Sequence, residues 1–415
     1  MAQSESRTIR YAMAGFCVLA LLMIFGWLVL REPPPSSEPP PVRVVTVTPR
    51  ARSVDALFTP DDEAPHEAIA NQVAGSELTA TNAATIYRQA FAMYDALSKE
   101  EKDLIGNWRT NVDASVETEL CQKIQPICDL LHQAAAISNC DWGLEQPITF
   151  ETRLPHLRPC RDMARAAAWS VAHCRTGDPT AAIDDLVAAS RLGQTVLSPP
   201  ILIGHLVDLA MQGIVIDSVT EHASVLLRSG DTRLADLFNN TDYNEGLRGT
   251  FEMEADVTTR AIDRLATLPP EEATRELAQI CNDSDPKIQS MGLEQDISAL
   301  RQVVELQRQY AQALELSDTD YRKWLNSLDE AGKTNPFVEG FVTSLGKAVD
   351  RTQAMTVRTA MAAAGLAVMQ SGPSALQSYP DPSTGQPFAY TQTADGFDLQ
   401  SSFQFQQKPV KLSFR

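Results

Sequence analysis

Proline is distributed unevenly along this chain of 415 residues, and its distribution limits the folds that the chain can adopt. Nine of the 25 prolines lie between Pro33 and Pro65, whereas residues 201–268 and 287–335 contain none. Because proline interrupts helices, the two proline-free stretches permit long helices. The crowded stretch favours an extended polyproline II spacer instead. We therefore predict a mainly α-helical body that is preceded by a proline-rich linker at residues 31–75.

An apolar segment lies before this linker. Residues 12–30 carry no charge, and as a helix they would span roughly 28 Å, close to the hydrocarbon thickness of a bilayer. A cleaved signal peptide is the alternative. It would have a shorter apolar region and small residues before its cleavage site, whereas this segment ends in Trp27-Leu-Val-Leu-Arg31. We therefore predict an uncleaved transmembrane signal-anchor whose partner is the lipid bilayer.

The residues that flank this segment bear on its orientation. The short N-terminal tail, residues 1–11, contains Arg7 and Arg10, which are matched in number by Arg31 and Arg43 beyond the segment. The short tail and its amine favour an N-inside orientation. We predict a single-pass protein of the inner (cytoplasmic) membrane whose large C-terminal domain is exported to the periplasm.

Side-chain periodicity predicts the helices of the body. Asn82 is typical of a helix N-cap. The apolar residues that follow it keep helical spacing on one face: Ile86, Ala90, Met93 and Leu97. Three aromatic residues lie beside that face: Tyr87, Phe91 and Tyr94. A later stripe has the same period: Ile297, Leu300, Val304, Ala311 and Leu314. We predict a helical domain at residues 76–285, a long-helix region at 286–372, and a C-terminal turn and β-hairpin at 373–415.

One pair of helices partly fits the tetratricopeptide pattern. Gly177-Asp178 lies at its turn, and small and bulky residues follow at the interlocking offsets: Ala182, Leu186 and Ala189. The 34-residue period does not recur, so the sequence predicts one tetratricopeptide-like hairpin and no array. Hairpins of this kind present concave surfaces to partner proteins.

Five short motifs occur in order in the first half of the body. They are Asn82-Ala-Ala-x-x-Tyr87-x-x-Ala90-Phe91, Cys140-Asp141-Trp142-Gly143, Leu154-Pro155-His156-Leu157, Gly177-Asp178 with Asp185-Leu186, and Leu202-Ile203. In this order they resemble a family of uncharacterised, membrane-anchored helical proteins of planctomycete-type bacteria. The likeness covers roughly residues 81–227 and implies a helical fold and an envelope location. The family has no established activity, so the resemblance transfers no catalytic role to any residue.

The last residues of the chain have an extended pattern. Asp395-Gly396 is a hairpin turn signal that separates two apolar pairs, Phe388 with Tyr390 and Phe397 with Leu399. This stretch is similar to the C-terminal loop and hairpin of type II secretion pseudopilins. The anchor lacks their processed motif with its glutamate, so the similarity supports a β-hairpin cap and not a pilus subunit. Three aspartates of this region can approach a calcium ion, although turn formation explains them more simply: Asp381, Asp395 and Asp398.

Charge argues against one class of partner. The chain contains 35 Lys and Arg against 53 Asp and Glu, which gives a net charge of −18. Such a chain repels phosphate backbones, so we predict no nucleic-acid partner.

Catalytic and metal-binding motifs are incomplete. Ser344-Leu-Gly-Lys347 matches the S-x-x-K pattern but its companion elements are missing. His66-Glu67 begins a zincin-like string, but position 70 is alanine. Two His and Cys pairs would bind zinc only if the fold brought them together: His156 with Cys160, and His173 with Cys174. The adjacent Asp184-Asp185 would point about 100° apart on a helix, so they do not form an acid–base pair. We predict no catalytic residue, no cofactor and no metal site.

Six residues are the candidates for a structural or interaction role: Cys140, Asp141, Trp142, Gly143, His156 and Cys160. We expect Asp141-Trp142-Gly143 to form a tight loop that docks on the helix starting near His156. Two functions fit. The first is a non-catalytic envelope protein whose helical body is a protein-interaction scaffold. The alternative is an exported enzyme with a dispersed site in which Asp141 and His156 transfer protons, and a deep pocket containing both would favour it.

Six cysteines follow Cys17 of the predicted anchor: Cys121, Cys128, Cys140, Cys160, Cys174 and Cys281. Export would permit disulfides among them, and six cysteines allow fifteen full pairings. Cys121 and Cys128 would lie about 10 Å apart on one helix, too far for a bond unless the helix breaks at Pro126. Cys140 and Cys160 flank the Asp-Trp-Gly loop, and we predict that they pair. The alternative is that all six are small buried thiols.

Overall fold

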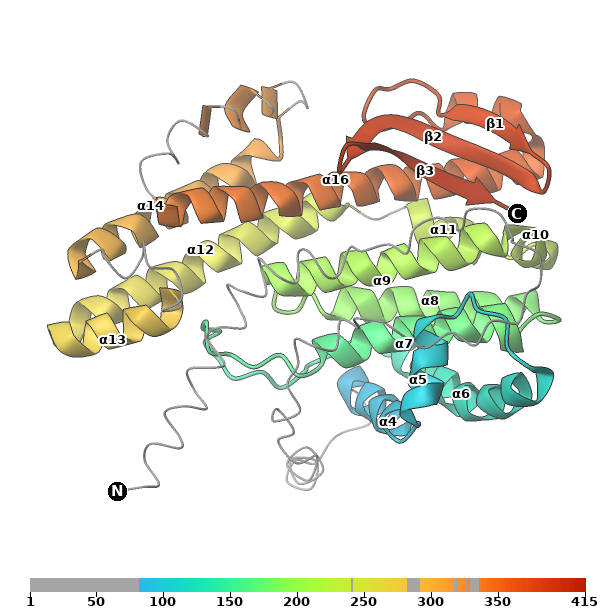
Figure 1. Ribbon diagram of the computed structural model, residues 1–415, viewed down its shortest axis with the longest axis horizontal. Coiled ribbons are helices and arrows are strands. Elements are labelled where there is room, and N and C mark those ends of the chain that lie inside the picture. Colours follow the sequence, from blue (N-terminus) through green and yellow to red (C-terminus); the bar gives the residue numbers. More distant parts are fainter. Residues whose placement is uncertain are drawn as a thin grey trace, which may run out of the picture.

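The computed structural model describes residues 82–239, 242–281, 292–316 and 336–415, together with part of 320–328. The predicted anchor and linker lie outside these residues. The described chain is mostly helical and ends in a small antiparallel sheet, which confirms the mainly α-helical class. The helices form two groups (Figure 1). α4 to α11 lie beside one another in a stack, whereas α12, α13 and α14 extend to one side along the first part of α16.

The first group contains, in chain order, α4 (Ala83–Asp95), α5 (Lys99–Gly106), α6 (Ala114–Ala135), α7 (Leu157–Trp169), the π-helical turn η4 (Ser170–Cys174), α8 (Pro179–Thr195), α9 (Leu202–Glu221), α10 (Ala223–Leu226), η5 (Leu227–Ser229) and α11 (Arg233–Asn239). After it come α12 (Tyr243–Thr267), α13 (Pro270–Cys281), α14 (Leu293–Ala313), α16 (Pro336–Ser371) and η6 (Pro373–Ser378). The strands are β1 (Ala389–Thr393), β2 (Gly396–Phe405) and β3 (Lys408–Phe414).

Capping residues set the starts of several helices. Asn82 caps α4, where its Oδ1 accepts a hydrogen bond from the Ala84 N–H at 3.0 Å, as predicted. Ser98 and Glu101 form a reciprocal capping box at α5. Asp178 caps α8, whose first residue is a proline. Local sequence therefore fixes where these helices begin.

The apolar stripe predicted after Asn82 lies along α4 and the turn after it, and most of it faces the core. Ala90 is fully buried, and Ile86 and Leu97 are partly buried against the core. Met93 is the exception, at 39% exposed. The three aromatic residues beside this stripe are also buried, because a large apolar area gains more from burial: Tyr87, Phe91 and Tyr94.

α9 is a central helix of the body. In the part of the chain that the structure describes, it is the one helix long and apolar enough to cross a membrane, and 78% of its most apolar window is buried inside the protein. It packs against α7, α8, α12 and α16. Its apolar composition is therefore explained by its place in the core.

Buried polar groups connect α9 to its neighbours. The Nε2 of His205 lies 2.9 Å from the Thr352 Oγ1 of α16. At the start of α9, the Leu202 N–H donates to the half-buried Glu254 carboxylate of α12 at 3.0 Å. This N–H has no partner within its own helix, so Glu254 supplies the acceptor that a cap residue would otherwise provide.

Asp208 of α9 is a buried carboxyl that faces α8. Its Oδ1 accepts a hydrogen bond from Gln212 at 3.0 Å, and Gln212 in turn accepts one from Ser190 of α8. A Cβ at Gly193 would lie 2.5 Å from the same Oδ1, so the two helices approach closely here. Burial raises the pKa of Asp208 from 3.8 to about 6, and the hydrogen bond from Gln212 opposes this shift.

Asp208→Asn is expected to raise the free energy of unfolding by about 2 kcal/mol at pH 7 and to change it little at pH 4. The folded protein keeps the Asp208 proton up to about pH 6, whereas the unfolded chain loses it near pH 3.8. The wild type therefore loses stability as the pH rises through this window. Urea denaturation at both pH values measures the difference.

The control is Glu252→Gln at an exposed position of α12, for which we expect a change below about 0.5 kcal/mol at either pH. A gain from Asp208→Asn of the same size at pH 4 and pH 7 would contradict the proposed linkage.

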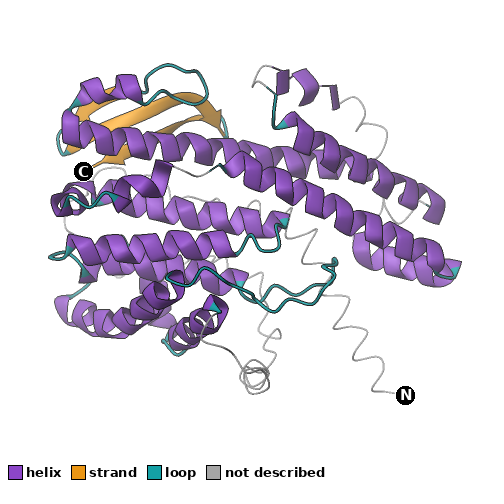
Figure 2. Ribbon diagram, turned by 180° about the vertical axis from the view of Figure 1, so that it is seen from behind, coloured by secondary structure: helices purple, strands orange, loops and turns teal. Residues whose placement is uncertain are grey.

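The C-terminal sheet has the order β1-β2-β3, and both pairs are antiparallel. The predicted hairpin is β1–β2, with Thr393 paired to Gly396 across its turn. β3 adds a third strand that was not predicted. Phe397, Leu399 and Phe403 of β2 alternate inward. In Figures 1 and 2 the sheet lies along one end of α16, the longest helix.

Close packing holds the sheet in place. The Phe414 ring lies over Gly365 of α16 so tightly that a Cβ at this glycine would be 1.9 Å from the Phe414 Cζ. Beyond β3, the Arg415 N–H donates to the Thr220 carbonyl at 3.3 Å, and the Arg415 carbonyl accepts from the Ser224 N–H at 3.2 Å. The end of the chain is therefore attached to both α16 and the α9–α10 junction.

Candidate functional site

The loop between α6 and α7 contains five of the six candidate residues, and Cys160 follows in α7. Asn82, the cap of α4, also holds this loop: its Nδ2 donates to the Asp141 carbonyl at 2.9 Å and its Oδ1 accepts from the Asp141 N–H at 3.0 Å. The exposed Asp141 carboxylate accepts from the Gly143 N–H at 2.8 Å. Gly143 has a φ of +67°, which favours glycine. Asp141 and Gly143 therefore form a tight turn, as predicted.

Trp142 is the side chain that docks the loop on the body. It is 4% exposed, and its ring stacks on His156 with centroids 4.5 Å apart and planes 13° apart. Tyr87 and Phe91 of α4 stack on it at 6.0 Å each. Its Nε1 donates to the Thr195 carbonyl of α8 at 3.1 Å. Trp142 thus joins α4, α8 and the start of α7, which confirms the predicted docking near His156.

His156 is a stacking residue in a dry environment. It is 6% exposed, directly precedes α7, and its Nδ1 has no hydrogen-bond partner among the described residues. Burial, together with the positive charge of Arg88, lowers the pKa of His156 to about 4. The Arg88 guanidinium donates to the Trp142 carbonyl. At neutral pH His156 is therefore uncharged.

The geometry does not join Asp141 to His156. The Asp141 carboxylate is turned toward its own loop, and no hydrogen bond between the two side chains occurs in the described structure. General acid–base catalysis needs both groups within reach of one substrate proton. The arrangement instead suits a loop that fastens helices together.

The predicted disulfide between Cys140 and Cys160 is wrong. The disulfide joins Cys121 of α6 to Cys174 of η4, with Cα atoms 5.5 Å apart, and both predicted cysteines are free. Burial raises the pKa of Cys140 to about 11, and it raises that of Cys160 well above its usual range. These two thiols stay protonated at neutral pH and are poor nucleophiles. Spacing along the chain gave no sign that α6 lies against η4.

The structure confirms that Cys121 and Cys128 do not pair. α6 continues through Pro126 without ending, so the two cysteines remain two turns apart on one helix. Cys128 is buried and free.

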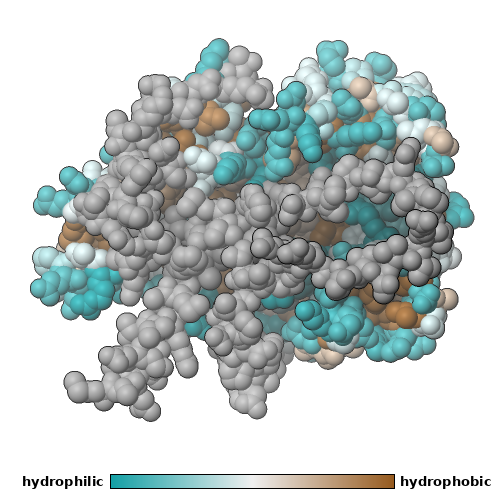
Figure 3. All heavy atoms as spheres, in the orientation of Figure 1, coloured by the Kyte–Doolittle hydropathy of each residue, from teal (hydrophilic) through white to brown (hydrophobic). Residues whose placement is uncertain are grey.

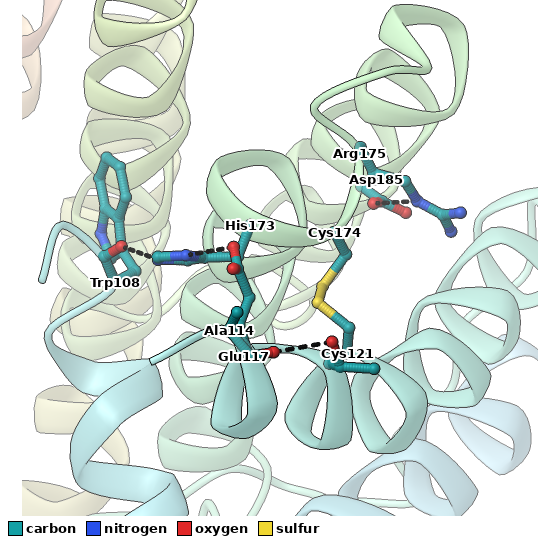
Figure 4. Close-up of a disulfide and its surroundings, with 9 residues drawn as sticks. Trp108, Ala114, Glu117, Cys121, His173, Cys174, Arg175 and Asp185 are labelled. Atoms are coloured by element: carbon teal, nitrogen blue, oxygen red, sulfur yellow. Dashed lines mark hydrogen bonds and ion pairs between the residues drawn. A yellow bond between two sulfur atoms is a disulfide. The ribbon is translucent and has the colours of Figure 1, made fainter. Parts of the chain in front are cut away.

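The environment of the disulfide contains a polar cluster that the sequence did not reveal (Figure 4). The Nε2 of His173 lies 2.8 Å from the Trp108 carbonyl, and its Nδ1 lies 3.2 Å from the Glu117 carboxylate. Next to it the fully buried Asp185 accepts from the Arg175 Nε at 3.3 Å. The sequence signals here were His173 beside Cys174, which we considered for zinc, and the adjacent Asp184-Asp185, which we did not expect to act as a pair.

Asp185 has a second side-chain partner, His132. The Nε2 of His132 lies 2.8 Å away, and this hydrogen bond raises the pKa of His132. The adjacent Asp184 points elsewhere and pairs with Arg233 at 2.7 Å, so the two aspartates diverge as predicted. Cys128 is close to Asp185, but burial raises the pKa of its thiol well above the usual range. An inert thiol here argues against a Cys-His-Asp nucleophile.

The described residues contain no group of three or more His, Cys, Asp or Glu side chains that could hold a metal ion. Cys174 is consumed by the disulfide. In the C-terminal region, the buried Asp381 accepts from Ser383 and from the Ser401 hydroxyl at 2.5 Å. Asp398 pairs with Lys411 at 2.7 Å. These aspartates hold turns and strands.

Comparison of the chain with protein-family models, with curated proteins and with solved structures finds no match.

Proposed function

We propose that this chain is a membrane-anchored, non-catalytic envelope protein whose exported helical body is a scaffold for a partner protein. The Cys121–Cys174 disulfide carries the proposal. Disulfides persist in oxidising compartments and are rare in the cytosol, so this bond supports an exported body. The sequence resemblance to membrane-anchored envelope proteins and the apolar segment at residues 12–30 support the same location.

The candidate residues support a non-catalytic role because their side chains bond or pack within the protein itself. Asp141 bonds to its own turn, and Trp142 fills the space between three helices. His156 is buried under Trp142 and uncharged at neutral pH. Each of these side chains stabilises the loop, and the exposed Asp141 carboxylate has no catalytic partner in His156.

A scaffold role is supported by the stacked helices α4 to α11 of the body, because stacked helices present extended surfaces to partner proteins. Where Figure 3 shows the described residues, hydrophobic atoms occur in small separate areas among hydrophilic ones. The large exposed hydrophobic residues are spread over separate elements: Met93, Val116, Leu316 and Tyr379. We expect a partner that makes mainly polar contacts, and the net charge of −18 argues against nucleic acid.

Alkylation of the protein in native membranes, before any reduction, is expected to leave a linked peptide pair that contains Cys121 and Cys174. Mass spectrometry should find alkylated thiols at Cys128, Cys140 and Cys160 once the protein is denatured. In intact spheroplasts an external protease should digest the body, because an exported domain is accessible there. Free thiols at both disulfide positions, together with protease resistance, would overturn the exported location.

The scaffold role is tested by proximity labelling in the native host. A labelling enzyme fused to the full chain is compared with the same enzyme fused to residues 1–75. The full chain should label a defined set of proteins that the anchor and linker do not. His156→Phe, which keeps a ring on Trp142, should label the same set. Identical labelling by both fusions would contradict the scaffold, and loss of cellular function in folded His156→Phe would favour the enzyme.

A further inference from the structure

The turn that carries Cys174 has an unusual winding. η4 continues α7 without a break, and the Arg175 N–H donates to the Ser170 carbonyl five residues earlier, at 2.9 Å. Single π-helical turns are rare, and many of them occur at functional sites. Such a turn holds one residue more than an α-helical turn. Rewinding it as an α-helix would rotate the residues after it by about 100°, the angle that one residue occupies.

The last two residues of this turn and the residue after it all contact other segments of the protein. Cys174 is bonded to Cys121 of α6. His173 stacks on Trp169 with ring centroids 4.0 Å apart, and it contacts Trp108 and Glu117 as described above. Arg175 reaches the buried Asp185 of α8. A rotation of about 100° would remove all three from their partners, so these contacts and the π winding depend on one another.

The disulfide is the one covalent bond among these contacts. Its two cysteines, Cys121 and Cys174, are half-buried, whereas the free Cys128 and Cys160 are buried. Two other contacts hold α6 to the body independently of the bond. His132 binds Asp185, and the apolar residues of α6 are fully buried in the core: Ile124, Ile127 and Leu131. We therefore expect α6 to stay packed on the body when the Cys121–Cys174 disulfide is reduced.

We propose that the Cys121–Cys174 disulfide is a redox-controlled lock on the π turn. A dithiol reductant supplies two electrons and two protons: the S–S bond breaks, both cysteines become thiols, and the reductant becomes a disulfide. The turn then opens, its amides lose their hydrogen bonds, and His173 and Arg175 withdraw from Trp108, Glu117 and Asp185. Reduction thus changes the surface at the junction of α6, η4 and α8 while the core persists.

Hydrogen–deuterium exchange of the full chain in lipid nanodiscs tests this proposal. The oxidised protein is compared with protein treated with dithiothreitol until Cys121 and Cys174 are fully alkylatable. We expect at least about tenfold faster exchange in peptides covering residues 170–178, which include the Arg175 amide. Exchange in α9 and α16 should not change, and the far-ultraviolet circular dichroism should keep its helical signal.

Two variants separate the lock from other effects of the reductant. Cys121→Ser/Cys174→Ser should show the fast exchange without reductant and should not respond to dithiothreitol. Cys140→Ser, which keeps the disulfide, should behave like the wild type. Unchanged exchange at residues 170–178 after full reduction would overturn the proposal. Faster exchange throughout the body, or a bond that resists reduction in the native protein, would also overturn it, because the disulfide would then be a structural staple.

Discussion

Gly365→Ala is expected to displace the C-terminal sheet from α16 and to lower the free energy of unfolding by about 3 kcal/mol. The new Cβ would lie 1.9 Å from Cζ and 2.3 Å from two further atoms of the Phe414 ring. The ring is buried and stacked on Phe397 with centroids 5.0 Å apart, so it cannot turn aside without moving the strands. Urea denaturation measures the loss, and limited proteolysis shows whether the sheet is released.

Gly346→Ala on the same helix is the matched control. Its Cβ would meet only the Tyr310 hydroxyl, at 3.8 Å, within ordinary contact distance. Alanine favours a helix more than glycine does, so this variant should gain up to about 1 kcal/mol. If both alanine variants had the stability of the wild type, the close packing of Phe414 on α16 would be disproved.

Trp142→Ala should lower the free energy of unfolding by about 3–5 kcal/mol and should not affect membrane insertion. The substitution removes the ring that His156, Tyr87 and Phe91 contact, and it removes the hydrogen bond to the Thr195 carbonyl. Trp142→Phe should lose less, because it keeps an aromatic ring in the stack. Thermal and urea denaturation of purified protein measure both variants.

Met93→Ala, at a side chain that is 39% exposed on α4, is the control and should change stability by less than about 0.5 kcal/mol. Unchanged stability in Trp142→Ala would mean that the indole serves a recognition surface instead of the fold.

The sequence predicted those parts of the fold that depend on local chemistry. Asn82 capped a helix as expected because its side chain satisfies a free N–H in the first turn. The hairpin turn before Gly396 and the docking of Trp142 were also predicted correctly, because turn residues and a large apolar ring leave few alternatives.

The features that were missed depend on contacts between distant segments. Cys121 and Cys174 are 53 residues apart, and their meeting requires both the packing of α6 on η4 and the extra residue of the π turn. Neither leaves a periodic signal in the sequence. The same holds for Asp185, whose two partners come from α6 and from the residue after η4. The third strand was missed because the turn before β3 consists of Gln406 and Gln407, which have positive φ without the glycine or asparagine that signals a hairpin.

The composition of α9 has a consequence for biosynthesis. A segment of this length and apolarity can leave a translocation channel sideways and remain in the bilayer as a stop-transfer sequence. If the body is exported, as we propose, retention of α9 in the bilayer would prevent the body from folding. An aspartate near the middle of such a segment costs about 3 kcal/mol of insertion free energy, and α9 carries Asp208 with His205 and Gln212 nearby. The carboxyl that weakens the folded protein at neutral pH therefore helps its core helix to pass through the channel.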